Sequence, residues 1–216
     1  SELITQRTAK ANQIRGLVAE YGLVAPKQLS SLRTAIPCWL EDAQNGLTGD
    51  FRALLHGVWN DLLGLDERVG EMDQVIKRLA ANNEDCVRLQ QLRGVGPMIS
   101  TAMVATMGDG RQYHKGRQMA AAIGITPRQH SSGSKDRLLG ISKRGDVYLR
   151  TLMIHGARSV IARAKHKDDR LSRWVTGIAT RRHPNVAAVA LANKTARMAW
   201  AILRHRTNYD PNFAMS

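Results

Sequence analysis

Residues 51–79 read FRALLHGVWNDLLGLDERVGEMDQVIKRL, and their apolar side chains recur alternately four and three positions apart. The positions are Phe51, Leu55, Val58, Leu62, Leu65, Val69, Met72, Ile76 and Leu79. This spacing is the a/d pattern of a heptad repeat, and it predicts a long helix whose apolar stripe packs against another helix. That helix can belong to the same chain or to another copy, and we expect a homo-oligomer formed through residues 51–79. An ordinary amphipathic helix packed within its own domain is the alternative.

The sequence on both sides of this stretch also predicts helices. They are expected at residues 3–23, 116–124, 147–165, 170–180 and 184–206. Asp146 is placed to cap one of them, and Pro184 to begin another. Residues 25–49 are interrupted by prolines and glycines, which predicts short helical pieces at most, and any strand should be short and lie around 125–142. The expected fold is therefore mostly α, with a long coiled-coil-like helix followed by a helical domain.

Positive charge is concentrated in the second part of the chain. The 216 residues carry a net charge of +14. Residues 1–86 hold 9 Lys and Arg against 12 Asp and Glu, a balance of −3, whereas residues 87–216 hold the remaining 23 against 6, a balance of +17. A basic region of this size favours a polyanionic partner bound through its phosphates, so we expect nucleic acid. The same change in composition suggests two domains, residues 1–86 and residues 87–216.

Other features narrow the class of protein. No stretch is apolar for the roughly 18 residues that a membrane span needs, and no secretory signal pattern opens the chain. Cys38 and Cys86 have no histidine cluster at metal spacing beside them, so they are expected to be reduced thiols of a cytoplasmic, nucleoid-associated protein. The chain begins with Ser1, which suggests a fragment or a processed protein.

Residues 92–97 read LRGVGP and precede a helical stretch. An apolar residue followed by a Gly-x-Gly turn and a helix is the pattern of a helix-hairpin-helix. Gly94 and Gly96 would allow a tight turn whose backbone N–H groups, at the start of the next helix, can bind a phosphate oxygen. A plain turn between helices is the alternative.

The stretch from Ser131 to Arg150 places serines on a glycine-containing loop among cationic side chains. The cations are Lys135, Arg137, Lys143, Arg144 and Arg150, and Arg128, just before the stretch, is a further candidate contact to nucleic acid. A serine that attacks a phosphodiester needs an exposed hydroxyl, cations beside the nonbridging oxygens and a proton acceptor. His130 is the one adjacent candidate base, and it could equally be an ordinary loop histidine. From composition alone, a phosphate contact or a linker is the simpler interpretation.

Three motifs carry a resemblance to a known family. They are LRGVGP, then AAIGITPRQHSSGSK, then LLGISKRGDVYLRTLMIHGAR. They resemble the C-terminal transposase domain of the DEDD-type insertion-sequence transposases, relatives of the pilin gene invertase that include bridge-RNA-guided recombinases. The match runs through residues 87–210, and residues 1–86 resemble the helical, coiled-coil region that precedes this domain in the family.

The resemblance implies a two-part enzyme. One part is an RNase H/RuvC-like domain with four acidic residues that bind Mg²⁺, and the other supplies a serine nucleophile that becomes covalently linked to cleaved DNA. The family's Ser-Gly motif falls on Ser132 and Gly133, so Ser132 is the candidate nucleophile and Ser131 the alternative. DNA, and a guide RNA with it, are the implied partners.

One part of the family's pattern is missing. The acidic N-terminal domain would lie before residue 1, and no metal site or cofactor is expected in this chain. The carboxylates of the basic half do not suggest a replacement; they are Asp109, Asp136, Asp146, Asp168, Asp169 and Asp210. We therefore expect the serine-bearing part of a DNA recombinase that does not recombine DNA alone. A non-catalytic nucleic-acid-binding module, an inactive transposase remnant and a coiled-coil adaptor are the alternatives.

Overall fold

The computed structural model describes residues 2–132 and 135–211, with side chains for all of these except residues 130–138. The chain divides into two compact units, Ser1–Val75 and Ile76–Ser216. The division falls inside a helix, whereas the sequence predicts a boundary between residues 86 and 87. Both divisions separate charge in the same way: residues 1–75 hold 7 Lys and Arg against 10 Asp and Glu, and residues 76–216 hold 25 against 8. The balances are again −3 and +17.

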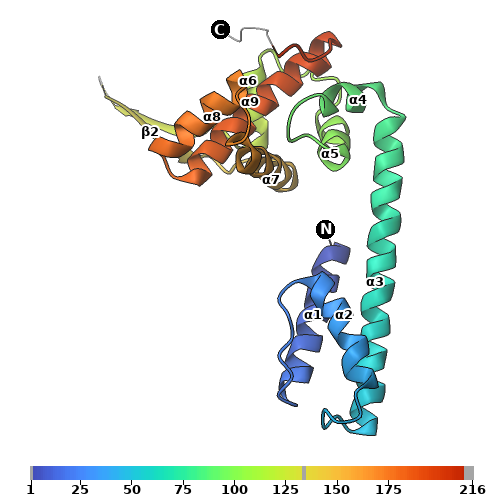
Figure 1. Cartoon of the computed structure of the whole chain (residues 1–216). Helices are drawn as coiled ribbons and strands as arrows, with labels where there is room; N and C mark the ends of the chain where they lie inside the picture. The colour runs from blue at the N-terminus through green and yellow to red at the C-terminus, as the bar shows by residue number, and fades with distance from the viewer. Residues whose placement is uncertain (1, 133–134, 212–216) are drawn as a thin grey trace. The chain divides into compact units, whose positions relative to one another are not determined.

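Unit 1 contains α1 (Glu2–Ala19), α2 (Leu29–Glu41) and the N-terminal part of α3 (Gly49–Ala81) (Figure 1). The helix predicted at 3–23 is confirmed, although it ends at Ala19. The prediction of short helical pieces at most for residues 25–49 is wrong, because α2 is 13 residues long and includes Pro37. Leu32 and Ile36 are both fully buried on one face of α2. Their burial offsets the hydrogen bond that a helix loses at a proline.

The apolar stripe of α3 is only partly buried. Its first members, Phe51, Leu55, Val58 and Leu62, belong to the core of unit 1 together with side chains from α1 and α2. Further along, Met72 and Leu79 are 48% and 57% exposed. The stripe therefore finds its partner helices within the chain over residues 51–62, as one of the two sequence-based interpretations predicts.

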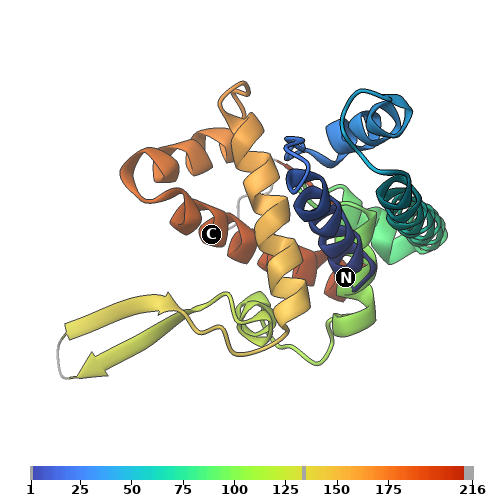
Figure 2. The ribbon, with the colours of Figure 1, turned by 90° about the horizontal axis from the view of Figure 1, so that it is seen from below.

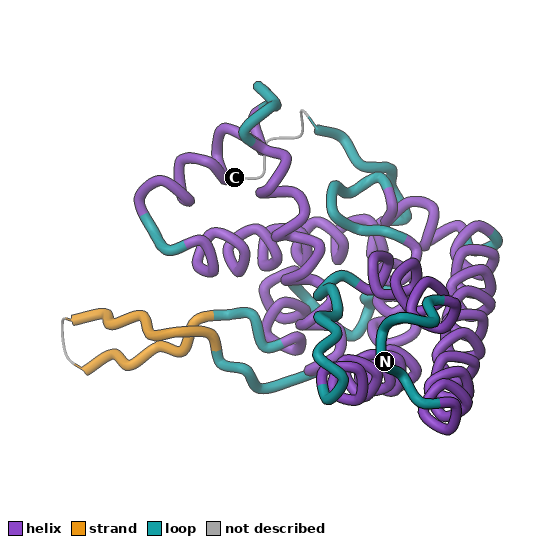
Figure 3. The backbone as a smooth tube through the Cα atoms, turned by 60° about the horizontal axis from the view of Figure 1, so that its bottom comes forward, coloured by secondary structure: helices purple, strands orange, loops and turns teal. Residues whose placement is uncertain are grey.

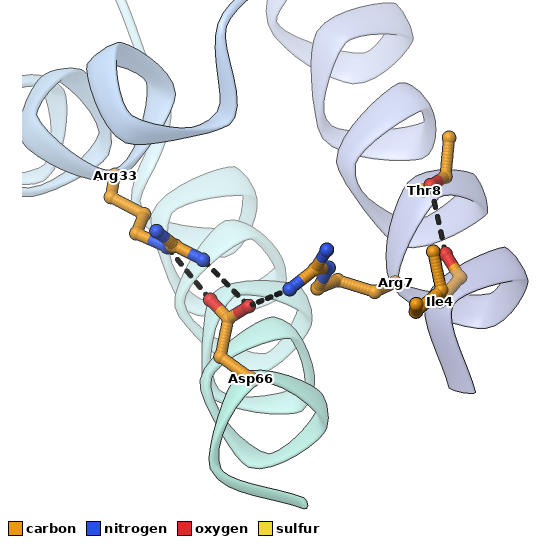
Figure 4. A network of polar contacts seen from close by, with 5 residues as sticks. All are labelled: Ile4, Arg7, Thr8, Arg33 and Asp66. Atoms are coloured by element: carbon orange, nitrogen blue, oxygen red, sulfur yellow. Dashed lines mark hydrogen bonds and ion pairs between the residues drawn. The ribbon is translucent and has the colours of Figure 1, made fainter. Parts of the chain in front are cut away.

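Asp66 of α3 connects all three helices of unit 1. Its carboxylate accepts hydrogen bonds from Arg33 Nε at 2.7 Å and Arg33 Nη2 at 2.6 Å, and from Arg7 Nη1 at 3.3 Å (Figure 4). Close to Arg7, the Thr8 hydroxyl donates to the Ile4 carbonyl at 2.8 Å. The Asp66 side chain is only 16% exposed, so these bonds compensate for the loss of its hydration.

Unit 2 is a helical body with one β-hairpin (Figure 3). After the end of α3 its elements are α4 (Glu84–Gln90), α5 (Pro97–Met107), α6 (Gly116–Ile123), β1 (Pro127–Ser132), β2 (Lys135–Ile141), α7 (Val147–Ala164), α8 (Arg170–Arg181) and α9 (Pro184–His205). These bounds confirm the helices predicted from residue 116 onward, and the mostly α fold with them. The α9 helix contacts α4, α6, α7 and α8 and supplies much of the buried core.

The two strands form an antiparallel hairpin, which confirms the prediction of short strands around 125–142. Pro127 pairs with Ile141 at the base of the hairpin, and Ser132 pairs with Lys135 near its turn. Figure 2 shows the hairpin projecting from the helices of unit 2. The serine-containing stretch therefore begins at a packed base and runs outward from it.

Candidate nucleic-acid interface

The LRGVGP stretch forms the turn between α4 and α5, as the sequence predicts. Gly94 has φ +84°, a left-handed conformation that glycine adopts without strain. A Cβ there would lie 2.8 Å from the Gly156 carbonyl oxygen of α7, and a Cβ on Gly156 would overlap the Gly94 carbonyl. Gly96 is different, because its φ is −97° and nothing lies within 4 Å of a Cβ placed on it. Gly94 thus sets the close packing of the turn on α7.

The turn and the C-terminal half of α7 enclose a groove of about 440 Å³. Its lining includes Gln91, Gly94, Gly96, Arg163 and Lys167. Arg163 and Lys167 are exposed. Gly96, which lines the groove, is the N-cap of α5, and no side chain makes a capping hydrogen bond at this helix start. Two cations beside an uncapped helix N-terminus form a suitable binding site for a phosphate group.

Arg93 also lines this groove, but its charge is already paired. Its Nη1 donates to Asp169 Oδ2 at 2.7 Å and lies 3.1 Å from Ser172 Oγ. Asp169 caps α8 by accepting from the Ser172 backbone N–H at 3.0 Å and from its hydroxyl at 2.7 Å. Desolvation opposes ionisation of Asp169, but the bonds from Ser172 and Arg93 outweigh it and lower the pKa to about 2. Arg93 therefore holds the turn against the start of α8.

The ISKRGD stretch, residues 141–146, closes the base of the hairpin. Backbone N–H groups of Ser142, Lys143 and Asp146 donate to Thr126, Gly124 and Ala122 carbonyls at 2.9, 3.1 and 3.3 Å. Positive φ angles at Gly124 and Gly145 allow this approach, since a Cβ on Gly145 would overlap the Ala122 carbonyl and one on Gly124 would overlap the Arg144 carbonyl. The motif that carries the family resemblance therefore has a structural role: it fixes the hairpin to α6.

Side chains from two helices strengthen this base. Asp146 caps α7 by accepting from the Leu149 N–H at 2.7 Å, as the sequence predicts. Arg150 Nη1 donates to the Ile123 carbonyl and Asn193 Nδ2 of α9 to the Ile125 carbonyl, each at 3.1 Å. Arg150, one of the candidate phosphate contacts, is thus engaged with the protein backbone.

The remaining candidates occupy the hairpin and the loop that follows it. Arg128, Lys143 and Arg144 are exposed, and Lys143 has a φ of +55°, uncommon for a residue other than glycine. The side chains of Lys135 and Arg137 lie outside the described residues. So do those of Ser131 and Ser132, whose backbones pair with Asp136 and Lys135. The predicted nucleophile stays a prediction.

Sequence reasoning missed Arg163 and Lys167, because they are far from the glycine turn along the chain and only the packing of α7 brings them beside it. It also missed a cationic face on α8, where Arg170, Arg173 and Arg181 are exposed with Trp174. Their spacing of three, one and seven residues places them on one side of a helix. That spacing could have been found from the sequence.

The described residues contain no group of three or more His, Cys, Asp or Glu side chains that could hold a metal ion. Asp146 and Asp169 serve as helix caps instead. The described part of the chain also contains no helix that is both long and apolar enough to cross a membrane.

Known proteins that are similar to this chain include transposases of insertion sequences. Residues 86–172 match the transposase family described as IS116/IS110/IS902. The chain is 44% identical over 207 residues to the transposase for insertion sequence element IS1111A of Coxiella burnetii, a match that covers 96% of this chain and 57% of the relative. It is 33% identical over 210 residues to the transposase for insertion sequence element IS1328 of Yersinia enterocolitica, covering 96% of this chain and 61% of the relative.

The chain therefore spans about three fifths of the length of these curated relatives. The family match begins in α4 and ends in α8, so it includes the glycine turn, the hairpin and its base. Residues 86–172 thus match the transposase domain of the IS116/IS110/IS902 family, within a chain that is similar to insertion-sequence transposases along nearly its whole length.

Proposed function

We propose that this chain is the DNA-binding, serine-bearing part of an insertion-sequence transposase that works at the bacterial nucleoid. The observation that carries the proposal is the groove between the glycine turn and α7, because it joins exposed cations to the uncapped start of α5 inside the matched transposase domain. In the proposal, a guide RNA is a second polyanion for the same basic unit.

In this proposal, a DNA phosphate lies in the groove between Arg163, Lys167 and the first N–H groups of α5. Lys143 and Arg144, both exposed at the base of the hairpin, neutralise phosphates further along the strand. Such contacts hold the DNA in position and are largely independent of base sequence. They should release counterions and make affinity strongly dependent on salt.

The proposed chemical step is transesterification by Ser132. Its oxygen attacks the phosphorus of a DNA phosphodiester, and one phosphorus–oxygen bond to deoxyribose breaks as the new bond forms. The displaced deoxyribose hydroxyl takes up a proton, the serine loses one, and the strand end stays linked to the protein. The proposal assigns Mg²⁺ binding to a part of the protein outside these 216 residues.

The binding step can be tested by measuring duplex affinity against salt concentration. In Arg163→Gln with Lys167→Gln, the plot of log affinity against log salt should become less steep by about 0.9, because the groove is proposed to hold one phosphate and each neutralised phosphate contributes roughly this amount. Lys27→Gln with Arg68→Gln removes the same charge from exposed positions in unit 1 and should change the slope little. Equal effects of the two pairs would contradict the groove assignment.

The chemical step can be tested by covalent trapping. The complete transposase, with Mg²⁺, its RNA and DNA spanning an end of its insertion sequence, should give a protein–DNA adduct that survives denaturation. Ser132→Ala should abolish the adduct, and Ser131→Ala should not. An adduct that persists in Ser132→Ala removes this residue from the nucleophile role, and loss in Ser131→Ala alone moves the role to Ser131. Salt-dependent binding without any adduct would favour a non-catalytic binding module.

A further inference from the structure

The exposed face of α8 combines one aromatic side chain with three arginines. Leu171, Ser172, Val175, Ile178 and Ala179 turn toward the core of unit 2. Arg170, Arg173, Trp174 and Arg181 are exposed, and Trp174 keeps 37% of its surface accessible. Trp174 therefore stands on the cationic side of this amphipathic helix, where packing of the core does not account for it.

A lysine from the neighbouring helix places a further positive charge directly against this ring. The Lys194 Nζ of α9 lies 5.0 Å from the centroid of the Trp174 ring. An ammonium at this distance is attracted to the face of the indole and restricts its orientation. The ring is thus held in place while more than a third of the residue stays open to solvent.

The arginines around Trp174 are available for an anionic partner. Arg173 approaches Asp168 at 3.7 Å, but the two side chains are 68% and 87% exposed, and such a pair is weak in water. Arg181 Nε donates to the Gly177 carbonyl of its own helix at 2.8 Å. From Arg170 to Arg181 the helix extends roughly 16 Å, so the charges lie on both sides of the ring along α8.

We propose that Trp174 is a stacking platform for an unpaired base of a nucleic-acid strand, whose backbone is held by Arg170, Arg173 and Arg181. A flat aromatic ring flanked by cations suits a single strand, because any unpaired base can stack on it while the phosphates meet the arginines. A duplex keeps its bases stacked internally and offers this ring no free face. This inference rests on the proposed nucleic-acid binding, and it adds that the nucleic acid bound by α8 is single-stranded.

The position of α8 supports this assignment. The hairpin and α8 lie on the same side of unit 2 (Figures 1 and 2). Asn193, next to Lys194 on α9, is hydrogen-bonded to the Ile125 carbonyl at the hairpin base. A strand that lies along the hairpin would therefore have α8 on the same side of the unit.

The test uses the full chain and 12-nucleotide probes: oligo(dT), oligo(U) and an abasic DNA strand of the same length. Wild-type protein should bind one or both base-containing strands about tenfold more tightly than the abasic strand. Trp174→Ala should remove this preference and leave affinity for the abasic strand within about twofold, whereas Trp174→Phe should keep most of it. Val186→Ala, at an exposed apolar residue of α9, is the matched control and should keep the preference fully.

A second readout works without the alanine variant. Oligo(dT) or oligo(U) should quench the fluorescence of the wild-type protein more than the abasic strand does, and Trp174→Phe should lose that difference. Preference for dT or for U assigns the strand to DNA or to RNA. Wild-type protein that binds all three probes equally would overturn the stacking role and leave the proposed function standing. Absence of salt-dependent binding to any probe or duplex would overturn both.

Discussion

Gly94 and Gly156 bring the backbone of the α4–α5 turn into direct contact with α7. Two properties are needed at Gly94: a left-handed φ of +84°, and no side chain where the Gly156 carbonyl oxygen lies. Gly96, two residues later, needs neither. The pair of glycines in one turn therefore divides into one that packing requires and one that it does not.

Gly94→Ala should destabilise the protein by roughly 1–3 kcal/mol, because it adds both a strained φ and an overlap with backbone. Gly96→Ala in the same turn is the matched control and should cost less than about 1 kcal/mol. Urea unfolding followed by circular dichroism measures both. Equal losses would mean that the turn does not pack on α7 as described.

Asp169 links the turn to α8, and its lowered pKa makes this link sensitive to acid. The folded-state pKa of about 2 lies below the ordinary value of 3.8, so the carboxylate stabilises the fold above pH 4. As the pH falls from about 4 to about 2, the unfolded chain takes up this proton first and the stabilisation is lost.

Asp169→Asn should therefore be less stable than wild type at pH 5, by no more than about 1 kcal/mol because the pair is partly solvent-exposed. The difference between the two proteins should shrink toward pH 2. The urea midpoints of both proteins at pH 5 and pH 2.5 measure this difference in stability. Because both proteins contain the same other carboxylates, the effect of pH on those groups cancels in the difference. A difference that stays constant with pH would show that Asp169 acts through its shape alone.

At the scale of the element, the heptad pattern of α3 is buried at its N-terminal end and partly exposed at its C-terminal end. Leu55 and Leu62 are fully buried among α1 and α2, whereas Met72 and Leu79 are about half exposed. An exposed apolar stripe on a long helix suits a second copy of the same helix. We therefore propose that copies of the chain associate through residues 65–79, and not through the whole stretch 51–79.

Val69→Asp with Met72→Asp should lower the sedimenting mass if copies associate through this stretch, since the change places charge in an apolar seam. Neither side chain is buried in a core, so the fold should survive, whereas charge at Leu62 would unfold unit 1. Gln74→Asp, exposed on α3 outside the stripe, is the control and should leave the mass unchanged. A wild-type protein that sediments as a monomer would remove the proposal.

At the scale of the whole molecule, charge and structure divide the chain in a consistent way. Unit 1 has a balance of −3 and unit 2 a balance of +17, and the matched transposase domain lies in unit 2. The two proposed contact surfaces of unit 2, the groove beside α7 and the exposed face of α8, come from different helices. As proposed, the groove receives duplex phosphates and the face of α8 receives unpaired bases, so both surfaces belong to the basic unit.

Local sequence determined most of the elements of this protein. The caps at Asp146 and Asp169, Pro184 at the start of α9 and the period of the apolar residues fix helices through contacts within a few residues. The one marked error was α2, where prolines and glycines predicted a broken segment. There the burial of Leu32 and Ile36 against other helices outweighs the local signal.

Only the tertiary structure decided which residues are exposed at the proposed contact surfaces and which hold one segment of the chain against another. Packing between segments far apart in the sequence places Gly94 against the backbone of α7, pairs Arg93 with Asp169 and lets Arg150 donate to a backbone carbonyl. The same kind of packing brings Arg163 and Lys167 to the groove. Spacing along the chain carries no information about such distances. The sequence by itself determined helices and net charge because both depend on neighbouring residues and composition, whereas the role of each cation depends on what the fold places beside it.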